Sequence, residues 1–536
     1  MNDYFLTYPY PSKRVCSIAK KGMVATSQPL AAQAGMEILK MGGNAVDAAI
    51  ATAACLTVVE PSSNGIGGDA FAIVWMNQSL YGLNASGPAP METTVDAVKA
   101  EGFSSVPERG FLPVTVPGAP SAWAALSKRF GKLSLTEVLK PAITYAREGF
   151  PLSPTAGRNW NTGVKRIKNQ VKGPAHDAFF EHYAPNGKIP QIGQIWKSEN
   201  TARTLESIAE TNGESFYRGE LADKIDAFSR KFGGKIRKND LANFYPEWVT
   251  PVSTNYKGYD IWEIPPNGQG TVVLMALNIL KGYTFHEKEN VDTYHTQLEA
   301  MKLAFTDGKE FISEKEDMKV RLEELLSDAY AEERRKEIKD TASLPKAGKP
   351  QHSGTVYVAA ADDEGNMVSF IQSNYRDFGS GLVVPETGIL LQNRGHNFSL
   401  DANHVNCLKP GKRTYHTIIP GFITKGETPI GPFGVIGAFM QPQGQVQVLM
   451  NMIEFGLNPQ AAIDAPRWQW FGDKKIMLET NVPRHIIEGL GRKGHEIVMS
   501  VDSNECGRAQ IIWRDPATGV YYGGTESRAD GSVAVW

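Results

Sequence analysis

The spacing of apolar residues predicts two helices near the start of the chain. Apolar side chains recur with helical spacing from Leu30 to Leu39, and we expect Ser27 to cap this helix and two consecutive glycines to end it. Asn44 opens a second helix that ends near Glu60. Because this second helix has small apolar side chains on every face, we expect it to be packed on all sides.

Further along, a glycine loop, a strand and several helices are predicted. The loop 64–69 leads into the strand-like residues 71–75. Amphipathic helices are expected at 134–148, 270–282 and 293–312, and no internal repeat is visible. Helix, loop and strand follow one another in the reverse of the order that a phosphate-binding loop needs, which disfavours nucleotide binding. We expect the loop to be a tight turn that brings the backbone close to another part of the fold, such as an active site.

Residues 336–354 differ from their neighbours. This segment is polar and rich in lysine, proline and glycine, so we expect it to be mobile or exposed. Directly after it, residues 355–361 and 367–371 are apolar and strand-like, and they flank a polar turn. The pattern predicts a β-hairpin whose first residue, Thr355, follows a flexible linker.

This position makes Thr355 a candidate nucleophile. A threonine hydroxyl needs a base beside it, and a cut between Gly354 and Thr355 would place a free α-amine on the same residue. An α-amine titrates at roughly 7.7–8.0, so it can accept a proton near neutral pH. A flexible linker would let the new end move aside after such a cut. On these residues alone, a plain loop that enters a strand remains the alternative.

Composition narrows the class of protein. The chain has 536 residues, 41% of them hydrophobic and 21% charged, which is typical of soluble globular proteins. Its length leaves two domains or one large layered domain open. The formal net charge of −2 gives no reason to expect nucleic acid or an anionic membrane as a partner. The four cysteines form no CxxC pair, and the start lacks the pattern of a secretory signal, so we expect a cytoplasmic protein without disulfides.

Several stretches resemble segments of the γ-glutamyltransferases, in the same order and across nearly the whole chain. They are MVATSQPLA at 23–31, GGNAVDAA at 42–49, GIGGD at 65–69, VPG at 116–118, PPNGQG at 265–270, EAMK at 299–302, FGSG at 378–381, TGILLQN at 387–393, FGLN at 455–458, APR at 465–467 and RADG at 528–531. The resemblance implies an α+β fold of the N-terminal-nucleophile hydrolase type, a four-layer αββα sandwich. It also implies a self-cleaved heterodimer that forms one composite domain. Its large chain, 1–354, would end in the linker 336–354, and its small chain, 355–536, would begin with the nucleophile.

The resemblance also assigns catalytic roles. The nucleophile of the family falls on Thr355, and a hydroxyl residue that hydrogen-bonds the nucleophile falls on Ser373. The paired glycines whose amides hold the oxyanion fall on Gly437 and Ala438, and a backbone N–H survives a change from glycine to alanine. Losing one such donor typically costs about 10²–10³ in rate. The implied activity is hydrolysis of γ-glutamyl-type or glutaryl-type amides through an acyl-enzyme on Thr355, with acyl transfer left open.

The substrate-binding positions depart from the family. Ser86 stands where the family carries an arginine for the substrate α-carboxylate, and a serine cannot replace a bidentate guanidinium. The other positions of the family's glutamyl site, which bind the ammonium group or form a double serine, fall on Tyr375, Arg394, Asn397, His416 and Thr417.

Arg394 changes the expected substrate. A substrate ammonium next to Arg394 would be repelled in a site with little water. Our hypothesis is that Arg394 binds a carboxylate, so that the acyl group is a diacid without the α-amine, such as the glutaryl group that cephalosporin acylases of this family use. The alternative is that Arg394 points away and forms a structural pair. His416 either tunes the site or fills space.

Other chemistries find little support in the sequence. The histidines show no HxH or HExxH spacing, so we expect no metal site and no cofactor, and the absence of GxSxG disfavours an α/β-hydrolase. The expected partner is a small-molecule amide substrate. The remaining alternative is a relative that keeps the fold, never cuts itself and serves in binding or scaffolding.

Overall fold

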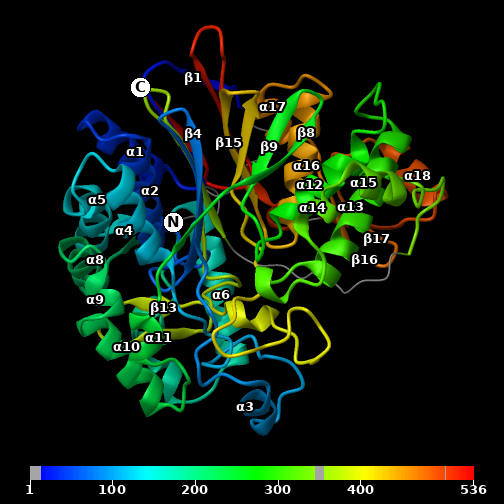
Figure 1. The fold of residues 1–536 in the computed structure, drawn as a ribbon. Coiled ribbons are helices and arrows are strands. Elements are labelled where there is room, and N and C mark those ends of the chain that lie inside the picture. The colour runs from blue at the N-terminus through cyan, green and yellow to red at the C-terminus, as the bar shows by residue number, and fades with distance from the viewer. Residues whose placement is uncertain (1–13, 345–354, 501–502) are drawn as a thin grey trace.

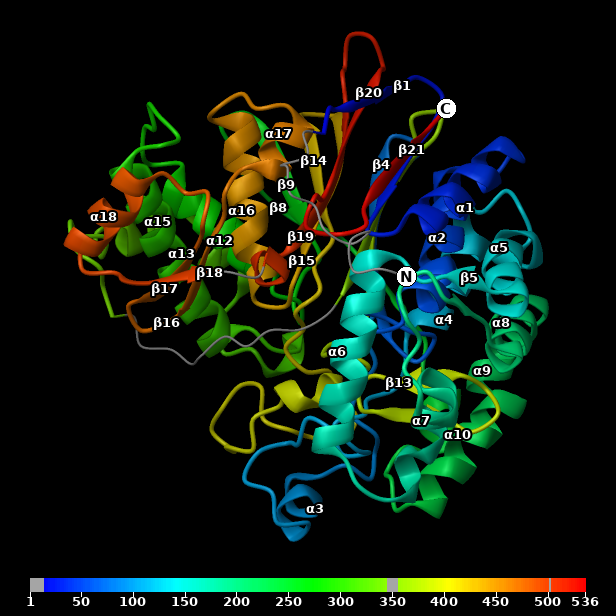
Figure 2. The same cartoon turned by 180° about the vertical axis from the view of Figure 1, so that it is seen from behind.

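Two large β-sheets face each other, and helices cover the outer face of each (Figure 1). A computed structural model describes residues 14–344, 355–500 and 503–536 of the chain. Gly354, one side of the predicted cut, lies outside the described residues. The view from behind shows the same succession of helices, two sheets and helices (Figure 2).

Each large sheet has seven strands, and all neighbours in both sheets run antiparallel. The first sheet consists, in order across it, of β1 (Ser17–Ala19), β20 (Tyr521–Thr525), β19 (Arg508–Arg514), β15 (Thr428–Ile436), β14 (Gly421–Lys425), β9 (Tyr259–Glu263) and β8 (Val252–Tyr256). The second consists of β21 (Ser532–Val535), β2 (Met23–Thr26), β10 (Val356–Ala361), β11 (Met367–Ser373), β3 (Asp69–Met76), β4 (Ser79–Ala85) and β7 (Glu247–Val249). Strands from both sides of Thr355 therefore share each sheet.

Two groups of helices form the outer layers. The helices on the side of the second sheet include α1 (Pro29–Lys40), α2 (Ala45–Val59), α4 (Ala119–Phe130), α5 (Leu135–Glu148), α8 (Glu199–Glu210), α9 (Glu214–Tyr217), α10 (Glu220–Lys231) and α11 (Lys238–Ala242). Those on the side of the first sheet include α12 (Gly270–Leu280), α13 (Val291–Phe311), α14 (Leu322–Leu325), α15 (Asp328–Arg335), α16 (Met440–Ile453), α17 (Pro459–Asp464) and α18 (Arg484–Arg492).

Smaller elements complete the fold. The remaining helices are α3 (Val95–Ala100), α6 (Pro154–Gln170) and α7 (Asp177–Tyr183), and the small sheets are β5 (Phe150–Pro151) with β6 (Ile195–Trp196), β12 (Leu382–Val384) with β13 (Ile389–Leu391), and β16 (Trp468–Gly472) with β17 (Lys475–Glu479) and β18 (Glu496–Ser500).

The layers enclose three large apolar cores. One lies between the second sheet and its helices, and another between the first sheet and its helices. The third lies between the sheets, where Phe71, Tyr357 and Ile371 of the second sheet meet Phe422 and other side chains of the first. Burial of apolar surface on both faces of each sheet is what stabilises a four-layer arrangement.

Most predicted elements are present at nearly the predicted positions. Asn44 caps α2 with its side chain, and every residue of that helix is buried, as its small apolar composition predicts. The predicted hairpin corresponds to β10 and β11, which pair directly. Among the described residues, no helix combines the length and the apolar character that crossing a bilayer needs.

The predicted cap of the first helix is wrong by one residue. Gln28, not Ser27, is the N-cap of α1, and its side-chain oxygen accepts a hydrogen bond from the Ala31 N–H. Pro29 fixes this start because a proline fits the first turn of a helix, where its missing N–H has no intrahelical partner to lose. Ser27 instead donates a hydrogen bond to Glu60 Oε2 at 2.6 Å.

The structure describes the first nine residues, 336–344, of the segment expected to be a linker. Ala342 is buried and its N–H donates to the Lys493 carbonyl at 2.7 Å, while the Ser343 N–H donates to Glu299 on α13 at 3.1 Å. The described part of this segment is therefore hydrogen-bonded to the body of the protein. The rest, 345–354, lies outside the described residues.

Candidate active site

Three polar side chains form a row across neighbouring strands of the second sheet. Thr355 directly precedes β10, Ser373 ends β11 and Asp69 begins β3. The strand pairing places Val356 opposite Gln372 and Ser373 opposite Asp69, so Thr355 lies opposite Ser373. Thr355 Oγ1 lies 3.2 Å from Ser373 Oγ, and all three side chains of the row are fully buried.

The row faces the space between the two sheets. Side chains two residues apart on a strand point to the same face. Tyr357, Ile371 and Phe71 each lie two residues from a member of the row, and all three belong to the core between the sheets. The sheet thus directs the candidate nucleophile inward, toward the facing sheet.

Two further groups contact the Thr355–Ser373 pair. The Tyr375 N–H donates to Ser373 Oγ at 2.8 Å, and Tyr375 has a positive φ of 74°. Gln441 Nε2 lies 3.5 Å from Thr355 Oγ1, and Gln441 Oε1 accepts the Ile419 N–H at 3.1 Å. Gln441 lies on α16, so it connects the start of this helix to the nucleophile position. No sequence pattern singled out Gln441.

The predicted oxyanion residues form the turn between β15 and α16. Gly437 has a φ of 125° and Ala438 a φ of 53°, a region that favours glycine. Among the described residues, neither backbone N–H donates a hydrogen bond to another protein group. Gln269 Nε2 fixes the turn, because it donates to the carbonyls of Ala438 and Thr417 at 2.8 and 2.7 Å. Within the described part of the chain, two backbone N–H groups next to Gln441 are therefore left to donate, and unpaired N–H donors are one requirement of an oxyanion site.

A buried ion pair continues the row beyond Ser373. Arg394 Nε lies 3.0 Å from Asp69 Oδ2, and His416 Nε2 lies 3.1 Å from the same oxygen. Burial alone would raise the pKa of Asp69, but the hydrogen bond from His416 and the charges around the carboxylate outweigh it and lower that pKa. Burial, together with Arg394, lowers the pKa of His416 to about 4, so this histidine is neutral near pH 7.

The other predicted substrate residues lie around Arg394. Its Nη1 donates to Thr417 Oγ1 at 2.8 Å, and its guanidinium lies 4.5 Å from the ring centre of Tyr375. The Tyr375 hydroxyl donates to Asn397 Oδ1 at 2.5 Å, and Asn397 in turn donates to the Tyr415 carbonyl. Arg394 therefore forms an ion pair within the protein, as the second of the two sequence hypotheses expected. This pair does not point away from the site, because Asp69 lies directly opposite Ser373.

Ser86 is placed apart from this group. Its hydroxyl donates to Asn84 Oδ1 at 2.7 Å and accepts from Asn267 Nδ2 at 3.2 Å. Its links to the segment that carries His416 are indirect: the Asn267 carbonyl accepts the His416 N–H at 2.9 Å, and Arg413 Nε donates to the Ser86 carbonyl at 3.0 Å. Within the described part of the chain, Ser86 makes no hydrogen bond to Thr355 or Arg394.

Asp69 was not among the predicted site residues, although it ends the glycine loop at 64–69 that was expected to approach another part of the fold. That loop approaches other backbone closely, as predicted. A Cβ on Gly68 would lie 2.7 Å from the Ser373 carbonyl oxygen, and a Cβ on Gly67 would collide with the Leu390 carbonyl. The glycines therefore allow the loop to pack beside Ser373 and to bring Asp69 into the row.

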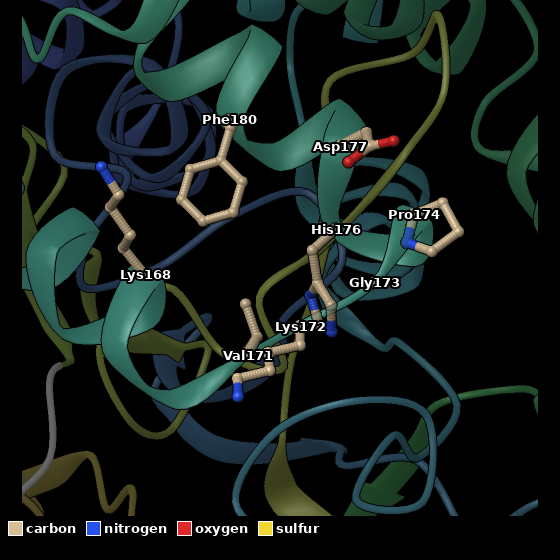
Figure 3. A pocket seen from close by; sticks show the side chains of 8 residues that line it. All are labelled: Lys168, Val171, Lys172, Gly173, Pro174, His176, Asp177 and Phe180. Atoms are coloured by element: carbon tan, nitrogen blue, oxygen red, sulfur yellow. The ribbon is translucent and has the colours of Figure 1, made fainter.

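Two other features lie outside this site. His295, Glu299 and His495 bring their ligand atoms within 4.8 Å of one another, but Lys302 Nζ already pairs with Glu299 at 2.7 Å. These histidines are far apart in sequence, so no spacing pattern could reveal them. A surface pocket of about 440 Å³ lies where α6 ends and α7 begins (Figure 3). It is lined by Lys168, Val171, Lys172, Gly173, Pro174, His176, Asp177 and Phe180, none of them a predicted site residue.

Comparison with known proteins identifies the family. A family model described as Gamma-glutamyltranspeptidase matches residues 31–536. The chain belongs to the γ-glutamyltranspeptidase family. Within this family, it is 38% identical to the "Glutathione hydrolase-like YwrD proenzyme" of Bacillus subtilis (strain 168), over 96% of this chain and 98% of that protein. It is 30% identical to the "Oxamate amidohydrolase proenzyme" of Klebsiella pneumoniae subsp. pneumoniae, over 97% and 99%.

A solved structure agrees with this assignment to the γ-glutamyltranspeptidase family. The crystal structure of cephalosporin acylase from Bacillus halodurans superposes with a TM-score of 0.97 at 61% identity, over 99% of this chain and 98% of that one. The predicted N-terminal-nucleophile hydrolase fold is confirmed, and the chain is an amidohydrolase of the γ-glutamyltranspeptidase and cephalosporin acylase type.

Proposed function

We propose that this γ-glutamyltranspeptidase family member cuts itself before Thr355 and hydrolyses small amides through an acyl-enzyme on that threonine. The observation that carries this proposal is the placement of Thr355. Its hydroxyl lies at the start of a central strand, 3.2 Å from Ser373 Oγ and 3.5 Å from Gln441 Nε2. The turn at Gly437 and Ala438, whose two N–H groups donate to no other group among the described residues, adjoins Gln441.

The chemistry follows from these groups. The α-amine that the cut creates takes the proton of the Thr355 hydroxyl, and Oγ1 attacks the amide carbonyl. The N–H groups of Gly437 and Ala438 stabilise the oxyanion that forms. The α-ammonium then gives its proton to the leaving amine, which departs and leaves an ester on Oγ1. Water, deprotonated by the same α-amine, attacks the ester and releases the acid with the hydroxyl restored.

The substrate class follows from the names of the relatives and from the site. One relative is named for oxamate and another for glutathione, and the similar crystal structure is that of a cephalosporin acylase. We therefore propose a γ-glutamyl-type or glutaryl-type amide as substrate, with hydrolysis as the main reaction. The active form would be the heterodimer of chains 1–354 and 355–536, and a cytoplasmic location stays a prediction.

A substrate panel on the purified protein tests this function. Anilides of γ-glutamic, glutaric and butyric acid, together with oxamate, would be incubated with the wild type and with Thr355→Ala. Release of amine by the wild type, and none by the variant, is the expected result. Thr57→Ala is the matched control, because Thr57 is also buried but lies on α2, away from the site. Equal release by the wild type and Thr355→Ala would show that Thr355 is not the nucleophile, and release by neither would favour a binding or scaffolding role.

A further inference from the structure

The Asp69–Arg394 pair has hydrogen-bonding capacity left over. Within the described residues, Asp69 Oδ1 and Arg394 Nη2 have no hydrogen-bond partner, although both side chains are fully buried. Buried polar atoms in native proteins are almost always paired, so two such atoms on one ion pair require an explanation. One atom is an acceptor and the other a donor.

The ion pair is electrically balanced. Asp69 supplies one negative charge and Arg394 one positive charge, joined through Oδ2 and Nε. His416 adds no charge, because its Nδ1 accepts the Ile418 N–H at 3.4 Å and its Nε2–H donates to Asp69. Any group that meets Oδ1 and Nη2 therefore meets a site without net charge.

The pair lies at the right distance from the nucleophile to meet an acyl group. Asp69 is two strands away from Thr355, across Ser373. Neighbouring strands lie about 4.8 Å apart, so the backbones of these residues are separated by roughly 10 Å. An acyl chain of a few carbons, bonded through its carbonyl to Thr355 Oγ1, would place its far end near this pair.

We propose that Asp69 is the specificity-determining residue of the acyl pocket, and that the pair receives an acyl head without net charge that presents a donor and an acceptor together. The donor of that head meets Asp69 Oδ1 and its acceptor meets Arg394 Nη2. An α-amino-acid zwitterion and a primary carboxamide both have this chemistry. A free carboxylate does not, since it would face Oδ1 with like charge. This inference rests on the proposed function and narrows its substrate.

Four anilides with the same leaving group separate these possibilities. The γ-glutamyl anilide carries the zwitterion, the glutaramoyl anilide the primary carboxamide, the glutaryl anilide the carboxylate, and the butyryl anilide no head group. The wild type is expected to favour one of the first two over the glutaryl anilide in kcat/KM by about tenfold or more. Preference for the glutaryl anilide would overturn the inference and support the diacid hypothesis.

The substitution Asp69→Asn tests whether the charge of Asp69 sets the preference for the acyl head group. The amide keeps the size of the side chain but leaves the charge of Arg394 unbalanced, so relative kcat/KM for the glutaryl anilide should rise about tenfold. An unchanged ratio would contradict the inference. Asp292→Asn is the matched control, because Asp292 is exposed on the first turn of α13.

Two readouts keep the outcomes distinct. If the protein self-cleaves and hydrolyses the butyryl anilide but shows no head-group preference, the inference alone fails. If it cleaves no anilide at all, the proposed function fails. Should Asp69→Asn not fold, competitive inhibition of the wild type by glutaramate and by glutarate decides the question: tighter binding of glutaramate is expected, and tighter binding of glutarate would overturn the inference.

Discussion

Replacing Ser373 by alanine tests the link between the strand row and the nucleophile. Ser373 Oγ accepts the Tyr375 N–H at 2.8 Å and lies 3.2 Å from Thr355 Oγ1, and a serine hydroxyl can accept one hydrogen bond while it donates another. Such a bond orients the Thr355 hydroxyl so that its own proton points toward a base. Ser373→Ala removes the bond without adding bulk.

The two hydrogen bonds that Ser373→Ala removes determine the expected loss of activity and of stability. A neutral hydrogen bond contributes about 0.5–1.5 kcal/mol net, which corresponds to a loss in kcat of about 2- to 13-fold if the bond matters fully in the transition state. The same change leaves the Tyr375 N–H buried without its acceptor, at about 1–3 kcal/mol of folding stability. Ser373→Ala should therefore lower both kcat and the thermal unfolding temperature, with little change in KM.

The assay is steady-state hydrolysis of an anilide by fully processed enzyme, with processing checked by mass. Ser373→Thr should recover most of the lost kcat, because it restores a hydroxyl at the same position. Ser380→Ala is the matched control, since the buried Ser380 hydroxyl donates to the Leu391 carbonyl and accepts the Leu382 N–H, two residues along the chain, as Ser373 accepts the Tyr375 N–H. Full kcat in Ser373→Ala would refute the orienting role. A loss above about 10⁴-fold would show that Ser373 acts as more than an orienting group.

Two further predictions concern the turn and the buried histidine. Ala438 has a φ of 53°, a conformation that glycine adopts freely and a β-branched residue adopts only with strain. Ala438→Gly should therefore keep kcat within about threefold, whereas Ala438→Val should lower kcat far more. Equal kcat in the two variants would contradict the turn geometry. Burial lowers the pKa of His416 to about 4, compared with roughly 6.5 in the unfolded chain. Between these two pH values the unfolded state binds more protons than the folded state. The free energy of unfolding therefore falls as the pH drops from 6.5 to 4. His416→Gln should show a shallower fall in unfolding temperature over that window, and an identical pH slope would show that His416 is protonated in the folded protein.

Local patterns in the sequence predicted most of the elements because their causes are local. Asn44 caps α2 through its own side chain, and the hairpin of β10 and β11 follows from two apolar runs around a polar turn. Where two local signals competed, the prediction failed. Ser27 is a good capping residue, but Pro29 places the start of α1 so that Gln28 takes the cap.

The site was predictable only as far as single positions could be matched to a family pattern. Thr355 and Ser373 lie together as expected, because their strands are neighbours in the hairpin. Asp69 could not be assigned, since its partner Arg394 is distant in the sequence, and it is the bridge between Gly67 and Leu391 that brings the loop before β3 beside the segment that leads to Arg394. The net charge around Arg394 depends on this long-range partner, so the arginine alone could not predict which acyl group the site would accept.

Intact-mass spectrometry of the purified wild type and of Thr355→Ala shows whether the chain cuts itself before Thr355. Two chains, 1–354 and 355–536, are expected for the wild type, and one uncut chain of 536 residues is expected for the variant. A wild type that stays uncut, or a variant that is cut at the same bond, would contradict Thr355 as a self-released nucleophile.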